Sequence, residues 1–214
     1  MNQAAIKLTI DDNGVATVLM DNAAKGNAFD DTIISQLTQA FNEVEKQNSV
    51  RVMILASTGK HFCTGADLNW MRKMINYSLE ENLVDARRLA KLFSTLNNLP
   101  IPTIARIQGA CYGGAVGLAS CCDMVVATPE ASFCLSEVKI GLIPATIAPY
   151  VIAAIGERAA RRYFNTAEVI PAENAERIGL VSHLAEQDAL DATVGNIIKP
   201  VSYTHLTLPT SPKV

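Results

Sequence analysis

A glycine-rich stretch in the middle of the chain constrains the fold most. It follows a mostly apolar run, Thr103 to Ile107, that has the pattern of a buried strand, and it continues without charge up to Asp123. A strand that breaks at glycine and resumes as a helix of small residues leaves the first N–H groups of that helix without an acceptor inside it. Such a turn can bind a phosphate, a carboxylate or a developing oxyanion. The glycines of this turn are Gly109, Gly113, Gly114 and Gly117.

Short apolar segments and helical patterns alternate along the rest of the chain. Asn13-Gly14 separates two apolar segments and predicts a hairpin. Strands that alternate with helices predict parallel pairing, right-handed crossovers and an α/β fold. The expected strands are residues 6–10, 15–20, 50–56, 103–107 and 124–127, and the expected helices are residues 31–47, 79–98, 147–155, 157–164, 172–178 and 188–199. In the helix over 79–98, the spacing directs five side chains inward, namely Leu83, Ala86, Leu89, Phe93 and Leu96.

Composition limits the compartment and the partners. The chain has 214 residues, of which 49% are hydrophobic and 18% charged, and this balance is typical of a globular protein. Its net charge is −3 and no basic run exceeds a pair, so we expect no nucleic-acid partner. The longest uncharged run, residues 140–156, is short for a membrane span and contains two prolines. With five cysteines in apolar surroundings and no signal-peptide pattern, the sequence predicts a cytoplasmic protein with reduced thiols.

Two loops share one pattern, because each follows an apolar strand, carries a glycine beside a small residue and leads into a helix. They are residues 64–67 and residues 112–115. If adjacent parallel strands carry these loops, backbone N–H groups from both can converge on one point. Two convergent donors stabilise a thioester or ester oxygen as it gains charge, and losing one typically raises the activation barrier by about 3 kcal/mol.

Four segments in order resemble one known family. They are Phe62-Cys63-Thr64-Gly65-Ala66-Asp67-Leu68, the stretch from Gly109 to Asp123, the loop at residues 25–29 and the segment at residues 135–142. Together they resemble the crotonase superfamily of enoyl-CoA hydratases and isomerases over residues 6–195. The resemblance implies a ββα spiral core over residues 1–143 and an incomplete helical C-terminal region over residues 144–200. Residues 201–214 are rich in Ser, Thr and Pro and look like a tail foreign to this family.

The resemblance also implies roles for individual residues. The N–H groups of Ala66 and Gly114 would form an oxyanion hole, and Gly114 would begin its helix, so that the helix dipole adds to the polarisation. The path of the thioester and pantetheine would be lined by Ala66, Asp67, Leu68, Asn69, Gly113 and Gly114. Lys25 and Lys60 would approach the nucleotide of coenzyme A, and the backbone of Ala28 would approach its adenine. Trp70 and Met71 could cover the acyl group, although a core role is equally compatible with the pattern.

One position departs from the family pattern. Hydratases of this family commonly use two glutamates, of which one matches Glu137 and the other falls on Gly117. Glu137 would then have to activate the water and return the proton as well. We expect the missing side chain to leave space and to lessen repulsion against an acyl group that carries its own carboxylate.

The resemblance favours hydration of a branched or carboxylated enoyl-CoA of the 3-methylglutaconyl type, as in leucine breakdown, or of its acyclic-terpene counterpart. It implies no metal and no cofactor beyond the coenzyme A of the substrate, and a homotrimer or hexamer. One glutamate could also serve a Δ3-Δ2 enoyl-CoA isomerase, and a non-catalytic acyl-CoA-binding protein is a further alternative. RNA binding, known for a relative, is disfavoured by the acidic balance.

Other polar residues have weaker claims to a function. His61 and Cys63 could suggest a nucleophile and its base, but their spacing alone does not support one. Asp123 is expected to be a buried residue that connects the end of a helix to the following turn. His183 is expected to lie in a strand and to serve packing or the surface.

Overall fold

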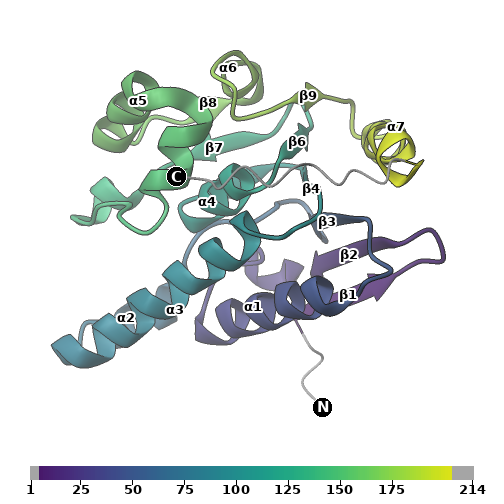
Figure 1. Cartoon of the computed structure of the whole chain (residues 1–214). Helices are drawn as coiled ribbons and strands as arrows, with labels where there is room; N and C mark the ends of the chain where they lie inside the picture. Colours follow the sequence, from purple (N-terminus) through teal and green to yellow (C-terminus); the bar gives the residue numbers. More distant parts are fainter. Residues whose placement is uncertain (1–4, 204–214) are drawn as a thin grey trace.

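Six strands form the main sheet in the order β1-β2-β3-β4-β6-β9 in the computed structural model, which describes residues 5–203 (Figure 1). The antiparallel pair is the predicted hairpin, β1 (Ile6–Ile10) with β2 (Val15–Met20), and every other neighbouring pair in this sheet is parallel. The remaining strands are β3 (Val52–Ser57), β4 (Thr103–Ile107), β6 (Met124–Ala127) and β9 (His183–Leu184). The predicted α/β architecture is therefore confirmed, with strand ends within two residues of those expected.

Both faces of this sheet are used because successive side chains of a strand point to opposite sides. Met53 and Leu55 of β3 belong to the larger core, which packs against α1 (Asp31–Lys46) and α3 (Leu79–Asn97). Val52 of the same strand belongs to a smaller core on the other face, which includes Leu190 and Val194 of α7 (Leu190–Tyr203). Each large apolar side chain buried in this way contributes roughly 1.5–3 kcal/mol.

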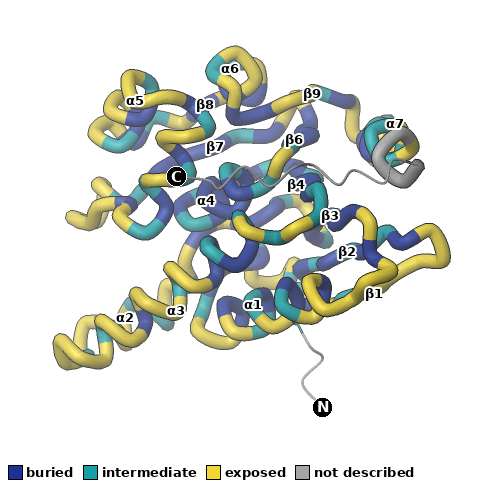
Figure 2. The backbone as a smooth tube through the Cα atoms, viewed as in Figure 1, coloured by how far each residue is buried: buried dark blue, intermediate teal, exposed yellow. Residues whose placement is uncertain are grey.

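A second, three-stranded sheet lies beside the first and carries the glycine-rich turn. It consists of β5 (Ala110–Tyr112), β7 (Ser132–Cys134) and β8 (Ile170–Pro171), with β7 in the middle. The glycine-rich turn leads from β5 into α4 (Gly114–Cys121), whose residues from Ala115 to Ala119 are all buried. The predicted helix after the glycines is therefore confirmed, but a strand that the sequence did not predict, β5, lies between β4 and this helix. Figure 2 shows α4 as one of the most deeply buried helices.

The C-terminal half of α3 packs in the core, whereas its first turns are exposed. This corrects the prediction that all five apolar side chains of this helix point inward. Its start is fixed by a capping box between Ser78 and Glu81. Phe93 and Leu96 are buried as predicted, but Leu83 is 44% exposed and Ala86 is exposed as well. The reason is tertiary, since the first turns of α3 and the helix α2 (Leu68–Met74) project beyond the sheet (Figures 1 and 2).

The C-terminal region is helical, as predicted. Two expected helices form α5 (Ala148–Thr166), which is broken at Gly156 by a φ of 78°. The helix α6 (Ala172–Arg177) follows. No helix of the described residues is long and apolar enough to cross a membrane.

The structure describes only the first three residues of the predicted tail at residues 201–214. Helix α7 ends at Tyr203, four residues beyond the expected helix end at residue 199. Residues 204–214 lie outside the described part of the chain. Whether they are foreign to the family stays a prediction.

The N-cap of α1 offers a direct test of local stability. Asp30 accepts a hydrogen bond from the Ile33 N–H at 2.8 Å, which satisfies one orphan donor of the first turn. We expect Asp30→Ala to lower the free energy of unfolding by about 1 kcal/mol and Asp30→Asn to leave it nearly unchanged. Urea unfolding followed by circular dichroism measures both, and equal loss in the two variants would contradict a capping role.

Candidate active site

The two glycine-bearing loops lie side by side because β3 and β4 are adjacent and parallel. Their continuations also pair directly, through a parallel bridge between Cys63 and Cys111. The N–H of Cys63 donates to the Ala110 carbonyl and that of Tyr112 donates to the Cys63 carbonyl, both at 3.0 Å. The two loops are therefore joined by main-chain hydrogen bonds.

Within the first loop, only the amide of Ala66 is left unused. The N–H groups of its neighbours all donate inside the chain: Phe62 to Gln108 O, Cys63 to Ala110 O, Thr64 to Gly26 O, Gly65 to Cys63 Sγ and Asp67 to Phe29 O. Among the described residues, the Ala66 N–H has no acceptor. This leaves a backbone donor on an exposed residue, available to an incoming group.

Phe29 explains the direction of the Ala66 amide. Phe29 donates to the Gly65 carbonyl at 2.8 Å and accepts from the Asp67 N–H at 2.7 Å, which makes a parallel bridge with Ala66. In a parallel ladder, the residue between two such bonds directs its own N–H and C=O to the opposite side. The Ala66 N–H therefore points away from Phe29.

The second loop supplies the amide of Gly114, the first residue of α4. The preceding Gly113 has φ 56° and ψ −125°, a conformation that is essentially restricted to glycine. The Gly113 N–H is used by Cys134 O at 2.8 Å, whereas the Gly114 N–H finds no acceptor within the described chain. At this end of α4 the helix dipole favours negative charge.

Glu137 brings a carboxylate to the place where these loops meet. It begins the 3-10 helix η2 (Glu137–Ile140). A methyl group at the Cβ position of Gly113 would lie 3.5 Å from Glu137 Oε1 and 3.9 Å from the Cα of Gly65. Gly113, which precedes the Gly114 amide, thus lies close to both Gly65 and this carboxylate.

The environment of Glu137 is unusual for a glutamate. Its Oε2 is buried and has no hydrogen-bond partner among the described residues. Burial raises the pKa of this carboxyl above its ordinary value, and a hydrogen bond to its own backbone lowers it less. A buried acceptor without a partner is uncommon in proteins, so this atom is free to accept from water or substrate.

The place of the second family glutamate is closed, which corrects our expectation of spare room. A side chain at Gly117 would begin 2.3 Å from Ile147 Cγ2 and 2.9 Å from Phe93 Cε1. Both of those side chains are fully buried. Apolar packing, not a cavity, therefore takes the place of the second carboxylate.

The residues predicted to contact coenzyme A differ in their exposure and surroundings. Lys25 and Lys60 are exposed, while Ala28 is buried at 8% exposure. The carboxylate of Asp67 caps α2, and its pKa is lowered first by the Trp70 N–H, then by the Asn69 N–H and by the charges of Lys25 and Lys73. Lys25 therefore lies near the start of α2, where Leu68 and Asn69 are exposed.

A Cys–His nucleophile is excluded by burial and hydrogen bonding. Cys63 is fully buried, and burial raises the pKa of its thiol to about 12, so that no thiolate forms near neutral pH. His61 Nδ1 accepts the Ala110 N–H at 3.1 Å. Both residues hold the loops together.

The remaining weaker candidates also have structural roles. Asp123 accepts from the N–H and the hydroxyl of Thr103, each at 2.8 Å, and so ties the end of α4 to the start of β4. It is exposed, not buried as expected. Trp70 packs partly against the core, and its Nε1 has no partner within the described chain. His183 lies in β9 and is exposed.

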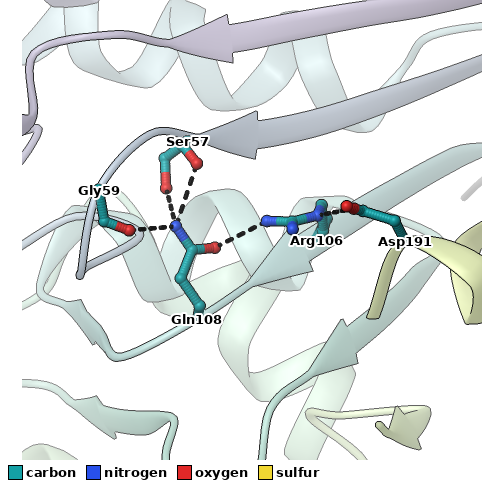
Figure 3. Close-up of polar contacts among 5 residues, drawn as sticks. All are labelled: Ser57, Gly59, Arg106, Gln108 and Asp191. Carbon is teal, nitrogen blue, oxygen red and sulfur yellow. Dashed lines mark hydrogen bonds and ion pairs between the residues drawn. The ribbon is translucent and has the colours of Figure 1, made fainter. Parts of the chain in front are cut away.

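Sequence reasoning missed the residues that hold the loop after β3. Gln108 Nε2 donates to the carbonyl and hydroxyl of Ser57, both at 3.0 Å, and to the Gly59 carbonyl at 3.2 Å (Figure 3). Gln108 Oε1 accepts from Arg106, which also pairs with Asp191 of α7 (Figure 3). The one sequence signal for this role was a polar residue, Gln108, immediately after the apolar strand β4.

Comparison with known proteins identifies the family of this chain. The chain matches the family described as enoyl-CoA hydratase/isomerase over residues 11–201. The chain belongs to the enoyl-CoA hydratase/isomerase family. The solved enoyl-CoA hydratase from Shewanella pealeana is 44% identical with a TM-score of 0.89, over 92% of this chain and 73% of that one. The crotonase fold is therefore established, and the homologues are enzymes.

Two curated relatives show how much of a whole protein this chain matches. Enoyl-CoA hydratase AKT6-1 of Alternaria alternata is 34% identical over 191 residues, 89% of this chain and 62% of the relative. The mitochondrial methylglutaconyl-CoA hydratase of Mus musculus is 30% identical over 180 residues, 83% of this chain and 56% of the relative. The chain thus spans less than two thirds of the length of either relative.

The closed position at Gly117 can be tested by a double-mutant cycle. We expect Gly117→Ala to destabilise this family member by about 1–3 kcal/mol, because the new methyl group overlaps with Ile147. In an Ile147→Ala background the same substitution should cost less, since the nearest obstacle has been removed. Urea unfolding of the four proteins measures the coupling, and additive effects would refute the overlap.

The raised pKa of Glu137 predicts a stability that depends on pH. Below the ordinary value of 4.5 the carboxyl is protonated in both the folded and the unfolded chain, and it carries no penalty. As the pH rises through the folded-state pKa, stability is lost because the ionised group is buried. We therefore expect Glu137→Gln to melt at a higher temperature than the wild type at pH 8, and the difference to shrink toward pH 4. A difference that does not vary with pH would contradict burial of the ionised form.

Proposed function

We propose that this chain is an enoyl-CoA hydratase that adds water to an α,β-unsaturated acyl-CoA. The observation that carries the proposal is the buried Oε2 of Glu137, unpaired among the described residues. The carboxylate lies beside Gly113, the residue before the free amide of Gly114. The amides of Ala66 and Gly114 are suited to a thioester oxygen, and the carboxylate is suited to a water molecule. Coenzyme A enters as part of the substrate, and no further cofactor is invoked.

The proposed reaction needs only these groups. Glu137 accepts a proton from water while the water oxygen bonds to C3, and electron density moves through the C2–C3 bond to the thioester oxygen. The two amides stabilise the resulting enolate, whose negative charge lies closest to them. Protonated Glu137 then returns its proton to C2, so that water adds to one face of the double bond. A raised pKa suits both steps, because it makes the carboxylate a stronger base and lets the acid persist until the enolate forms.

We further propose a branched or carboxylated acyl group of the 3-methylglutaconyl type. The similarity to the mouse methylglutaconyl-CoA hydratase supports this choice. The absence of a protein carboxylate at Gly117 supports it as well, since no side chain at that position repels a carboxylate on the substrate. A homotrimeric or hexameric, cytoplasmic protein completes the proposal, in agreement with five free cysteines among the described residues.

Isomerisation is the second candidate, because a single carboxylate can move a proton between C4 and C2 of a 3-enoyl-CoA. Glu137 is the one carboxylate of the described chain that the structure brings against Gly113. A binding protein without activity is the third candidate. Incubation with 2-enoyl and 3-enoyl thioesters separates the three, since hydration removes the conjugated absorption band, isomerisation creates it and binding alone does neither.

The decisive variant is Glu137→Gln, assayed with a glutaconyl-type CoA ester and with crotonyl-CoA. We expect kcat for hydration to fall by about 10²- to 10⁴-fold, the usual contribution of a general acid–base group. Glu130→Gln is a matched control, because Glu130 is an exposed glutamate seven positions earlier. Hydration that survives Glu137→Gln within a few-fold would refute the mechanism. A preference for crotonyl-CoA in the wild type would refute the proposed acyl group alone.

A further inference from the structure

Asn27 is a buried amide in the loop that precedes α1. Its residue is 1% exposed, and its backbone has a φ of 54°, a left-handed conformation that is uncommon for residues other than glycine. The side-chain oxygen accepts from the Asn22 N–H at 2.9 Å. The side-chain nitrogen donates to the carbonyls of Thr58 and His61, each at 2.9 Å. Both polar atoms of its side chain are thus hydrogen-bonded to the main chain.

These hydrogen bonds join two segments that are distant in the sequence. On one side is the 25–29 segment, which carries Lys25 and Ala28. On the other is the loop after β3, which leads to Ala66. Two further contacts tighten the junction, because the Thr64 N–H donates to Gly26 O at 3.0 Å and a methyl group on Gly26 would lie 2.7 Å from Thr64 Oγ1.

The junction reaches the Ala66 amide through Phe29. Asn27 stands two residues before Phe29, whose N–H and carbonyl hold Gly65 and Asp67 on either side of Ala66. A shift of the 25–29 segment would therefore rotate the peptide that carries the Ala66 N–H. Asn27 itself is fully enclosed, so it acts on that amide without touching substrate.

We propose that Asn27 is a positioning residue that aims the Ala66 amide at the thioester oxygen. The inference rests on the proposed function, because it assumes that this amide polarises a thioester. The amide of Asn27 holds the 25–29 segment and the Ala66 loop as one unit. The segment that would anchor coenzyme A therefore keeps a fixed distance from the donor that would stabilise the enolate.

Two variants distinguish a change in the orientation of the Ala66 amide from a loss of folding. Asn27→Gly keeps the left-handed backbone and removes the amide, whereas Asn27→Asp keeps the volume and the acceptor for Asn22 but loses both donors. Asn98→Gly is the control, because it also removes an amide that donates to a carbonyl, that of Ser94, and it lies at the exposed end of α3. Urea unfolding and circular dichroism establish that each variant is folded under the conditions of the assay.

The readouts are kcat, KM and the absorption of a bound aromatic 2-enoyl-CoA, whose red shift reports polarisation of the thioester carbonyl. We expect both Asn27 variants to lower kcat by about 10- to 100-fold, the usual result of a misplacement near 1 Å. KM should change less than threefold, and the red shift should shrink. Asn98→Gly should leave all three unchanged.

The opposite results are equally clear. If folded Asn27 variants keep kcat within threefold, or lose kcat while the red shift per bound ligand stays at the wild-type value, Asn27 does not position the amide. A wild-type chain that neither hydrates the thioesters nor shifts the chromophore would refute the proposed function, and this inference with it. The wild-type measurement alone thus distinguishes the two failures.

Discussion

The parallel bridge between Phe29 and Ala66 is the interaction on which the candidate site depends. It uses the carbonyl of Gly65 and the amide of Asp67, and so leaves the amide of Ala66 directed to the other side. The bridge between Cys63 and Cys111 then brings this loop against the turn that leads into α4. Among the described residues, the amides of Ala66 and Gly114 therefore remain free while their neighbouring loops are held together.

Apolar side chains pack against two glycines of α4. Phe29, Phe93 and Ile147 lie so close to Gly114 and Gly117 that neither glycine could carry a side chain without displacing them. Near Gly113, Glu137 keeps one oxygen buried and unpaired. The ionised carboxylate lowers the stability of the fold, because the described part of the chain supplies no partner for this oxygen. Such perturbed carboxylates are typical of functional sites.

The same geometry explains why one family can include hydratases and isomerases. Both reactions pass through an enolate on the thioester oxygen, and they differ in whether the carboxylate takes its proton from water or from a carbon of the acyl chain. In this chain apolar packing at Gly117 leaves Glu137 as the one proton carrier that we propose.

The sequence alone determined the α/β order of elements, the glycine turn before α4 and the family, because these depend on local periodicity and on motifs of fixed spacing. It also singled out Glu137 and the free amide of Gly114, which follows from the helix start. Tertiary structure decided the rest. Ile147 fills the place beside Gly117 from 30 positions away, the first turns of α3 lack a sheet to cover them, and Asn27 reaches loops more than 30 positions distant. Such contacts depend on how separate elements pack, and no local pattern encodes them.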